Sequence, residues 1–444
     1  MNLQNKTILV LGLGATGLAV CEFVSKRGAV VIGVDDSPLE RLSEKAQSFF
    51  SNHLFSNTED ETLLENKIDL IITSPGVPLF HPLLSEAKER KIPITGELEF
   101  ASHFTSAPVI AVTGTNGKST TTELVGAMLK NAGKQVMVGG NLGEPWLSLI
   151  QKNDQPDFFV LEVSSFQLET VEHFHAHIAA LLNITDDHFE RHQHMRGYID
   201  AKARICLNQN ETDFFVYNSG DIHVLEMLES VQAKTIPFSS TQKVEGVYWK
   251  SESVICSRER GSYYDLSKAT LEGLHNIENM MAAIAMAELA GVPASLIQKT
   301  LENFKALPHR LEWVREVQGV NYYDDSKGTN VGAVAMSVAS FDKPVILILG
   351  GKDKGGDYGI LKGLLRNKVK ALVLIGEAKE IIRACFEGLL PILDATSMED
   401  AVYTCSSLAA KDDVVLLSPA CSSFDMFKDY KHRGDEFQKW VKKL

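Results

Sequence analysis

The segment Gly114-Thr-Asn-Gly-Lys-Ser-Thr120 constrains this chain more than any other. An apolar run, Val109–Val112, predicts a buried strand before it, and a stretch with one apolar helical face follows and stops before Gly133. In such a strand–loop–helix unit, backbone N–H groups cradle phosphates, Lys118 meets the β/γ charge and a hydroxyl ligates Mg²⁺. A strict GxxxxGK[ST] match would need glycine at Val112, so the loop departs from that spacing. We nevertheless predict nucleoside triphosphate binding here.

Length and strand pattern predict three domains. The chain has 444 residues, too many for one core, and short apolar runs alternate with helical stretches throughout. Each run ends in a loop of small residues, as in parallel sheets. We therefore predict an α/β protein with a Rossmann-like domain over residues 1–98, a central P-loop-type α/β domain over 99–305, and a Rossmann-like C-terminal domain over 306–444.

A second glycine-rich loop lies near the N-terminus. Gly12-Leu-Gly-Ala-Thr-Gly17 follows an apolar run, and Asp35 and Asp36 end the next one. Glycines at this spacing let backbone N–H groups approach a diphosphate at a helix N-terminus. We therefore favour diphosphate binding over a tight strand–helix turn without a ligand, although the pattern does not distinguish NAD from another nucleotide.

Charge and composition exclude several classes of function. Lys and Arg number 44 against 57 Asp and Glu, a net charge of −13, which argues against a general binder of nucleic acid or anionic membranes. No apolar run approaches the ~18 residues of a membrane helix, and the first residues lack the apolar core of a signal peptide. The six cysteines form no CxxC pair. We expect a soluble, cytoplasmic protein with reduced thiols.

Candidate metal ligands follow the central strands. Glu162 ends an apolar run, where a second Mg²⁺ ligand beside a phosphate loop belongs, although a solvated glutamate is the simpler alternative. Histidines cluster at positions 173, 175, 177, 188, 192 and 194, and the first three alternate as on a strand. His188-Phe-Glu-Arg-His192 is not HExxH and no cysteine is near, so zinc is disfavoured. His188 is the position we favour near the nucleotide.

Three further polar loops are ambiguous by themselves. They are Asp324–Asn330, the lysines after Gly350-Gly351, and Ser418–Phe424. Each follows an apolar run, and each suits an anionic ligand as well as it suits an ordinary surface loop.

Several short motifs occur together in a specific order. They are GTNGKST (114–120), EVSSFQLE (162–169), NITDDHFERH (183–192), GLHNIEN (273–279), LPHR (307–310), DDSKGTN (324–330) and LSPACSSFD (417–425). This set resembles the Mur ligases, the ATP-dependent amide-forming enzymes of peptidoglycan precursor synthesis. The resemblance covers all three predicted domains and is greatest to the members that add D-glutamate to UDP-N-acetylmuramoyl-L-alanine.

The resemblance assigns the N-terminal glycine loop to a UDP-sugar rather than to NAD. It places the uridine and diphosphate against residues of the first domain and the muramoyl part near Asn141. The residues implied are Leu13, Gly14, Ala15, Thr16, Asp35, Asp36, Ser74, Pro75 and Gly76.

The resemblance also implies ATP between the second and third domains. The ATP residues implied are Gly114, Thr115, Asn116, Gly117, Lys118, Ser119, Thr120, Asn276, Asn279, Arg310 and Asp325. Two Mg²⁺ sites are implied, with Ser119, Glu162, His188 and a carbamylated Lys202 as ligands. Lys118, His188 and Lys202 are the implied catalytic residues.

The third domain is implied to hold D-glutamate. Lys327, Thr329, Lys354, Ser423 and Phe424 match the positions that bind it, with Lys352 an alternative register for Lys354. We expect a monomer with no nucleic acid or membrane partner. Three alternatives stay open: a related or folylpolyglutamate-type ligase for another amino acid, an NAD-dependent oxidoreductase, and an ATP-gated binding protein without catalysis.

Overall fold

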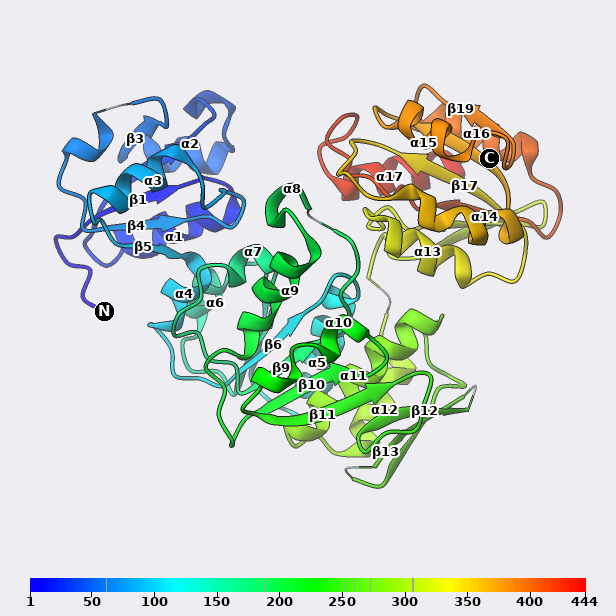
Figure 1. The fold of residues 1–444 in the computed structure, drawn as a ribbon, viewed down its shortest axis with the longest axis horizontal. Helices are drawn as coiled ribbons and strands as arrows, with labels where there is room; N and C mark the ends of the chain where they lie inside the picture. Colours follow the sequence, from blue (N-terminus) through cyan, green and yellow to red (C-terminus); the bar gives the residue numbers. More distant parts are fainter. Residues whose placement is uncertain (61, 188, 252, 259, 272, 306) are drawn as a thin grey trace.

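The computed structural model describes residues 1–444 except positions 61, 188, 252, 259, 272 and 306. It confirms the predicted fold class, because the strands form three separate, mainly parallel sheets of five, nine and six strands. Figure 1 shows them as three lobes, with the central lobe below and the terminal lobes above it on either side.

The N-terminal lobe is a parallel sheet in the order β3-β2-β1-β4-β5. Its elements are β1 (Thr7–Leu11), α1 (Ala15–Ser25), β2 (Val30–Asp35), α2 (Glu44–Phe50), β3 (Leu54–Asn57), β4 (Leu70–Thr73), α3 (Pro82–Glu89) and β5 (Ile94–Gly96). The apolar residues of β1 are buried on both faces, as expected for a strand covered by helices on both sides.

The central lobe has the order β14-β13-β12-β11-β10-β9-β6-β8-β7. Its strands are β6 (Val109–Thr113), β7 (Val136–Gly140), β8 (Phe158–Glu162), β9 (Ile178–Leu181), β10 (Phe214–Asn218), β11 (Lys234–Ser239), β12 (Val247–Ser251), β13 (Val254–Ser257) and β14 (Ser262–Asp265). Its helices are α4 (Glu97–Ser102), α5 (Lys118–Asn131), α6 (Trp146–Lys152), α7 (Ser165–Leu168), α8 (Phe189–His192), α9 (Met195–Ala203), α10 (Ile222–Leu225), α11 (Leu274–Leu289) and α12 (Ala294–Asn303). The strand β13 is antiparallel to both of its neighbours, β12 and β14.

The C-terminal lobe has the order β15-β16-β20-β17-β18-β19, with β15 antiparallel at one edge. Its elements are β15 (Glu312–Val317), β16 (Val320–Asp324), α13 (Val331–Ala339), β17 (Val345–Gly350), α14 (Lys362–Lys368), β18 (Val369–Ile375), α15 (Lys379–Phe386), β19 (Ile392–Asp394), α16 (Met398–Leu408), β20 (Val414–Leu417) and α17 (Tyr430–Val441). Across the described residues, no helix combines the length and the apolarity that a membrane crossing requires.

The strand pattern predicted for the histidines at 173, 175 and 177 is wrong, because β9 begins only at Ile178. The carboxylate of Glu99 accepts hydrogen bonds from the backbone N–H groups of residues 172–174. These donors are therefore not available to a β-ladder, and the segment bends instead. The predicted helix after Lys118 is confirmed: it ends at Asn131, and Gly133 follows with φ +78°.

Candidate active site

The phosphate-type loop runs from β6 into α5 and depends on two glycines. Gly114 has φ +150° and Gly117 has φ +84°, and a Cβ on Gly117 would lie 2.1 Å from Oδ1 of Asn279. Asn183 holds the loop from the end of β9, because its carbonyl accepts from Thr115 N at 2.9 Å and its Oδ1 from Asn116 N at 2.8 Å. The loop is thereby fixed at the N-terminus of α5, where anions bind.

Two lysines approach the same loop, the half-buried Lys118 and the fully buried Lys202. Lys118 Nζ donates to the carbonyls of Gly114 and Thr115, each at 2.9 Å, and Lys202 Nζ donates to the Gly114 carbonyl at 2.8 Å. Burial lowers the pKa of Lys118, while Glu162 and Asp187 oppose that shift. Burial, reinforced by the charge of Lys118, lowers the pKa of Lys202 well below the value of an ordinary lysine. The protonation equilibrium of Lys202 is therefore shifted toward the neutral amine.

A carboxylate lies opposite these lysines at the end of β8. Glu162 accepts a hydrogen bond from the Ser119 hydroxyl and one from Asn141 Nδ2 at 2.6 Å. Burial by itself would raise the pKa of Glu162, but Lys118 and these two donors hold it below the ordinary value. An ionised carboxylate beside a serine hydroxyl is an oxygen donor set that Mg²⁺ prefers.

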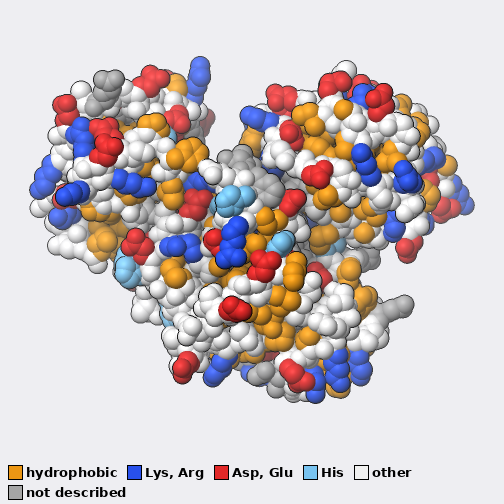
Figure 2. All heavy atoms as spheres, in the orientation of Figure 1, with side chains coloured by type: hydrophobic (Ala, Val, Ile, Leu, Met, Phe, Trp, Pro, Cys, Tyr) orange, Lys and Arg blue, Asp and Glu red, His pale blue; other side chains and the backbone are white. Residues whose placement is uncertain are grey.

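Side chains of the C-terminal lobe, which lies above the central lobe in the views of Figures 1 and 2, close the site. Arg310 Nη2 donates to Ser119 Oγ at 2.5 Å, and Lys354 Nζ lies 3.0 Å from Asp187 Oδ1. Asn330 Nδ2 reaches Asn116 Oδ1 at 3.1 Å and Asp187 Oδ2 at 3.2 Å. The central and C-terminal lobes together enclose a cavity of about 300 Å³, lined among others by Lys118, Ser119, Asn141, Glu162, Lys202, Arg310, Lys327, Thr329 and Lys354.

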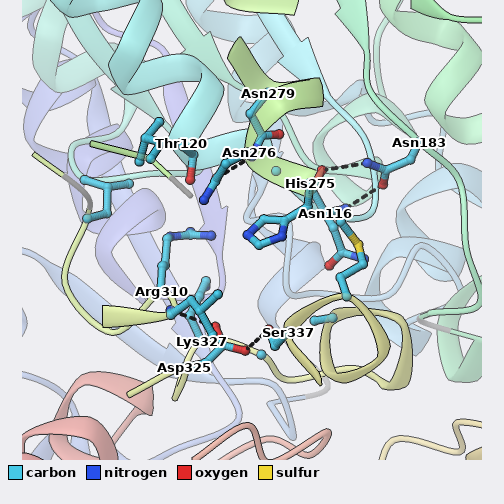
Figure 3. Close-up of a pocket in the computed structure, with 17 residues that line it drawn as sticks. Asn116, Thr120, Asn183, His275, Asn276, Asn279, Arg310, Asp325, Lys327 and Ser337 are labelled. Atoms are coloured by element: carbon cyan, nitrogen blue, oxygen red, sulfur yellow. Dashed lines mark hydrogen bonds between the residues drawn. The ribbon is translucent and has the colours of Figure 1, made fainter. Parts of the chain in front are cut away.

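A second, smaller cavity of about 80 Å³ adjoins the first, and Figure 3 shows it in close-up. Thr120, Asn276 and Asn279 line it from the central lobe, and Asn279 Nδ2 donates to Asn276 Oδ1 at 3.2 Å. From the C-terminal lobe, Asp325 accepts from the hydroxyls of Ser337 and Ser418, each at 2.7 Å. Burial raises the pKa of Asp325 to about 6. Apart from Gly114, the residues that the resemblance assigned to ATP line these two cavities, which share Asn116 and Arg310.

The N-terminal glycine loop is built differently. Leu13 N donates to Asp35 Oδ2 at 2.7 Å, and Ser74 Oγ donates to the Gly12 carbonyl at 2.6 Å, so the loop is braced from β2 and from the loop after β4. Gly14 and Ala15 are exposed at the N-terminus of α1, Thr16 is half-buried, and Asp36 is exposed. The Ser74-Pro75 turn, followed by the exposed Gly76, shares a small cavity with Phe166, which also lines the large cavity.

The residues predicted for D-glutamate divide into two groups. Lys327, Thr329 and Lys354 line the large cavity. Ser423 is buried in the loop after β20, and Phe424 is 71% exposed. Lys352 is exposed and its backbone bridges to Ser422, so Lys354 is the lysine of this pair that reaches the cavity.

Burial, aided by the nearby Arg310, lowers the pKa of Lys327 to about 8, and its Nζ lies 4.2 Å from the ring centre of Tyr430. His188, predicted as a catalytic residue and metal ligand, lies outside the described residues.

Sequence reasoning missed four residues that shape the site: Asn183, Asp187, Asn330 and Tyr430. The first three belong to motifs already singled out, so proximity within those motifs was the available signal. Tyr430 lies 103 residues after Lys327, and no local pattern connects the two.

A phosphate-type loop, a buried carboxylate and cations from a second lobe define a nucleotide-dependent enzyme with three α/β domains. Family models match each lobe: "Mur ligase MurD-like, N-terminal domain" over residues 6–96, "Mur ligase middle domain" over 112–287, and "Mur ligase, glutamate ligase domain" over 309–421.

Full-length relatives include a UDP-N-acetylmuramoylalanine--D-glutamate ligase of Geotalea daltonii, 44% identical over 100% of this chain and 99% of its own. One of the same name from Desulfosudis oleivorans is 41% identical over 99% of this chain and 97% of its own. The chain belongs to the Mur ligase family of ATP-dependent acid–amino-acid ligases.

Solved structures share the fold over nearly the whole chain. UDP-N-acetylmuramate-alanine ligase MurC from Thermotoga maritima has a TM-score of 0.64 at 17% identity, covering 99% of this chain and 98% of its own. The MurF ligase of Thermotoga maritima in complex with ADP has a TM-score of 0.61 at 16% identity, covering 99% of this chain and 96% of its own.

Proposed function

We propose that this enzyme joins D-glutamate to UDP-N-acetylmuramoyl-L-alanine, converting ATP to ADP and phosphate. The names of its full-length relatives support this substrate pair. The observation that carries the proposal is the cavity between the central and C-terminal lobes. Lys118 and Glu162 line it from one lobe, and Lys327 and Lys354 from the other, so cations for phosphate and for an acidic amino acid face the same space.

In the first step, a carboxylate oxygen of the UDP-sugar substrate attacks the γ-phosphorus of ATP, and the bond to ADP breaks. Lys118 and Arg310 line the cavity and would offset the negative charge of the phosphoryl oxygens, which is the main contribution a protein makes to this chemistry. Loop N–H groups at the start of α5 hold the nucleotide phosphates. The product is an acyl phosphate.

In the second step, the amine nitrogen of D-glutamate attacks the acyl carbon and forms the amide bond. The bond between the acyl carbon and the phosphate oxygen breaks, and phosphate leaves. The amine releases a proton in this step. Lys327 and Lys354 supply two cations for the two carboxylates of D-glutamate. The low pKa of Lys327 reflects its burial beside Arg310, and an arriving carboxylate stabilises its charged form.

The oxygen atoms of Ser119 and Glu162 fit one Mg²⁺ ion, and the family resemblance implies a second. Ser119 and Glu162 would hold one, and a carbamylated Lys202 with His188 the other; bound there, the ions would neutralise charge on the phosphoryl oxygens. Carbamylation joins the neutral Lys202 amine to the carbon of CO₂ and releases a proton. The buried position and the lowered pKa of Lys202 favour the reactive neutral amine.

The amino-acid panel is the first test. Phosphate release is measured with ATP, Mg²⁺ and UDP-N-acetylmuramoyl-L-alanine, adding D-glutamate, L-alanine, L-lysine or meso-diaminopimelate. Turnover is expected with D-glutamate alone. Strong turnover with a diamino acid and none with D-glutamate would overturn the proposal in favour of a related ligase.

Lys354 and Lys352 form a matched pair for the amino-acid site. Lys354→Met is expected to raise the KM for D-glutamate by roughly 10- to 100-fold, because it removes one charge-assisted contact to a carboxylate. Lys352→Met should leave the KM near that of the parent enzyme. Equal effects of both variants would contradict the assignment of Lys354.

Lys202→Ala tests the carbamate. Turnover should fall by about 100-fold or more, while the UDP-substrate still binds, and short carboxylic acids should restore part of the activity by replacing the lost anion. Protein equilibrated with ¹³CO₂ should show a carbamate carbon resonance that Lys202→Ala removes. Absence of both the resonance and the rescue would refute the carbamate. Monomeric state remains a prediction, to be measured by light scattering.

A further inference from the structure

A buried carboxylate lies at the junction of the N-terminal and central lobes, away from the proposed active site. Glu99 belongs to α4, the helix that follows directly after β5 of the N-terminal sheet. Its Oε2 accepts hydrogen bonds from the backbone N–H groups of Glu172, His173 and Phe174, each at 2.9 Å. These three donors fix the position of the carboxylate and favour its ionised form.

The other oxygen of Glu99 faces two imidazoles. Oε1 lies 3.1 Å from Nδ1 of His173 and 3.6 Å from Nε2 of His103, and the three atoms all lie within 4.8 Å of one another. The two imidazole ring centres are 6.0 Å apart. The side chains of His103 and His173 are 36% and 71% exposed, so solvent reaches the space between them.

We propose that Glu99, His103 and His173 bind one divalent transition-metal ion of the zinc class, with water completing its coordination. Tetrahedral zinc, with bonds of about 2.0–2.1 Å, places neighbouring ligand atoms roughly 3.4 Å apart, and the separations of 3.1 Å and 3.6 Å bracket that value. Imidazole suits zinc, whereas Mg²⁺ prefers oxygen ligands, so this site differs in chemistry from the phosphate cavity.

The three backbone donors on Oε2 act as the orienting partners that metal-binding carboxylates usually have. The ion would tie α4 to the segment before β9. Because α4 follows directly after β5 of the N-terminal sheet, the ion would stiffen the point where that lobe joins the central one, independently of nucleotide.

Cobalt provides the test, because Co²⁺ substitutes for zinc and absorbs visible light with an intensity that reports its geometry. Metal-free full-length protein in millimolar Mg²⁺ is titrated with Co²⁺ and, by calorimetry, with Zn²⁺. One equivalent is expected to bind with a tetrahedral-type visible spectrum. His103→Ala and His173→Ala should each weaken binding by at least tenfold.

His175→Ala is the matched control, because His175 lies in the same segment but pairs with Asp213, its Nε2 2.8 Å from Oδ2. It should bind Co²⁺ as the parent does. His103→Cys supplies a replacement ligand and should restore binding with a new sulfur-to-cobalt absorption band, a signature that a hydrogen-bonding role would not produce. Zn²⁺ should raise the melting temperature of the parent and not of His173→Ala.

The proposal is overturned if the Co²⁺ spectrum and affinity of His103→Ala and His173→Ala equal those of the parent. It is also overturned if no equivalent binds in the presence of Mg²⁺, or if His175→Ala abolishes binding.

Discussion

The chain has two glycine-rich turns between a strand and a helix, and they differ in charge. In both, glycines with positive φ bring the loop backbone to a helix N-terminus: Gly12 before α1, and Gly114 and Gly117 before α5. The first turn is braced by the carboxylate of Asp35, whereas the second is surrounded by Lys118, Lys202 and Arg310.

This difference shows that a shared backbone device does not determine the ligand. Loop N–H groups at a helix N-terminus donate hydrogen bonds to any phosphate. A triphosphate whose γ-phosphoryl group must react requires cations and metal ligands as well. Of the two turns, the second is the one that these groups surround. The first turn, beside Asp35 and the exposed Asp36, suits a ligand that is bound and not cleaved.

The largest expected effect comes from removing the lysine of the second turn. Lys118→Ala should lower kcat by about 10³-fold, because the developing phosphoryl charge loses its nearest cation. Steady-state phosphate release measures this, and binding of the UDP-substrate by calorimetry should stay unchanged. If Lys118→Ala kept a tenth of the parent activity, the proposed difference in charge between the two turns would not explain their functions.

The glycines of the first turn offer a matched pair. A Cβ on Gly17 would lie 1.9 Å from the Gly12 carbonyl oxygen, whereas a Cβ on Gly14 would meet nothing within 4 Å. Gly17→Ala should therefore destabilise the protein by about 3 kcal/mol, measured by urea unfolding. Gly14→Ala should leave stability unchanged and weaken UDP-substrate binding. Equal stability of the two variants would contradict a packing role for Gly17.

Glu97, on the helix α4 that follows the N-terminal sheet, should make the stability of the protein depend on pH. Burial raises the pKa of Glu97 to about 7 against 4.5 in a model peptide, so folding favours the protonated carboxyl. Its contribution to stability is complete below pH 4.5 and is lost as pH rises through 7, by about 2 kcal/mol between pH 5 and 8. Glu97→Gln should remove this slope from the thermal midpoints at the two pH values. A slope identical to that of the parent would disprove the shift.

The smallest effects are expected from one threonine in each turn, and each should change the KM of one substrate only. Thr16→Val in the first turn is expected to raise the KM of the UDP-substrate a few-fold, about 1 kcal/mol, and to leave that of ATP unchanged. Thr120→Val in the second turn should do the opposite. Initial-rate kinetics with each substrate varied in turn measure both, and a shared effect on both KM values would show that the turns are not independent.

Local patterns predicted the strands and helices around both turns because burial there follows the sequence closely. Leu124, Val125, Met128 and Leu129 are all fully buried on α5, as their spacing indicates. The same reasoning failed for His173, His175 and His177. Alternating residues form a strand only when their backbone N–H groups are free to pair with a neighbouring strand. Glu99, more than 70 residues earlier in the chain, takes three of them.

The sequence by itself determined the class of chemistry, since a glycine loop with Lys118 and Ser119 specifies phosphate binding through local backbone geometry. It also determined three α/β domains, because apolar strands alternate with helices along the whole chain. Only the tertiary structure decided which distant residues meet: Arg310 with Ser119, Lys354 with Asp187, and Glu99 with His173. Those contacts join residues that are distant in sequence, and their distances depend on how whole sheets and helices pack.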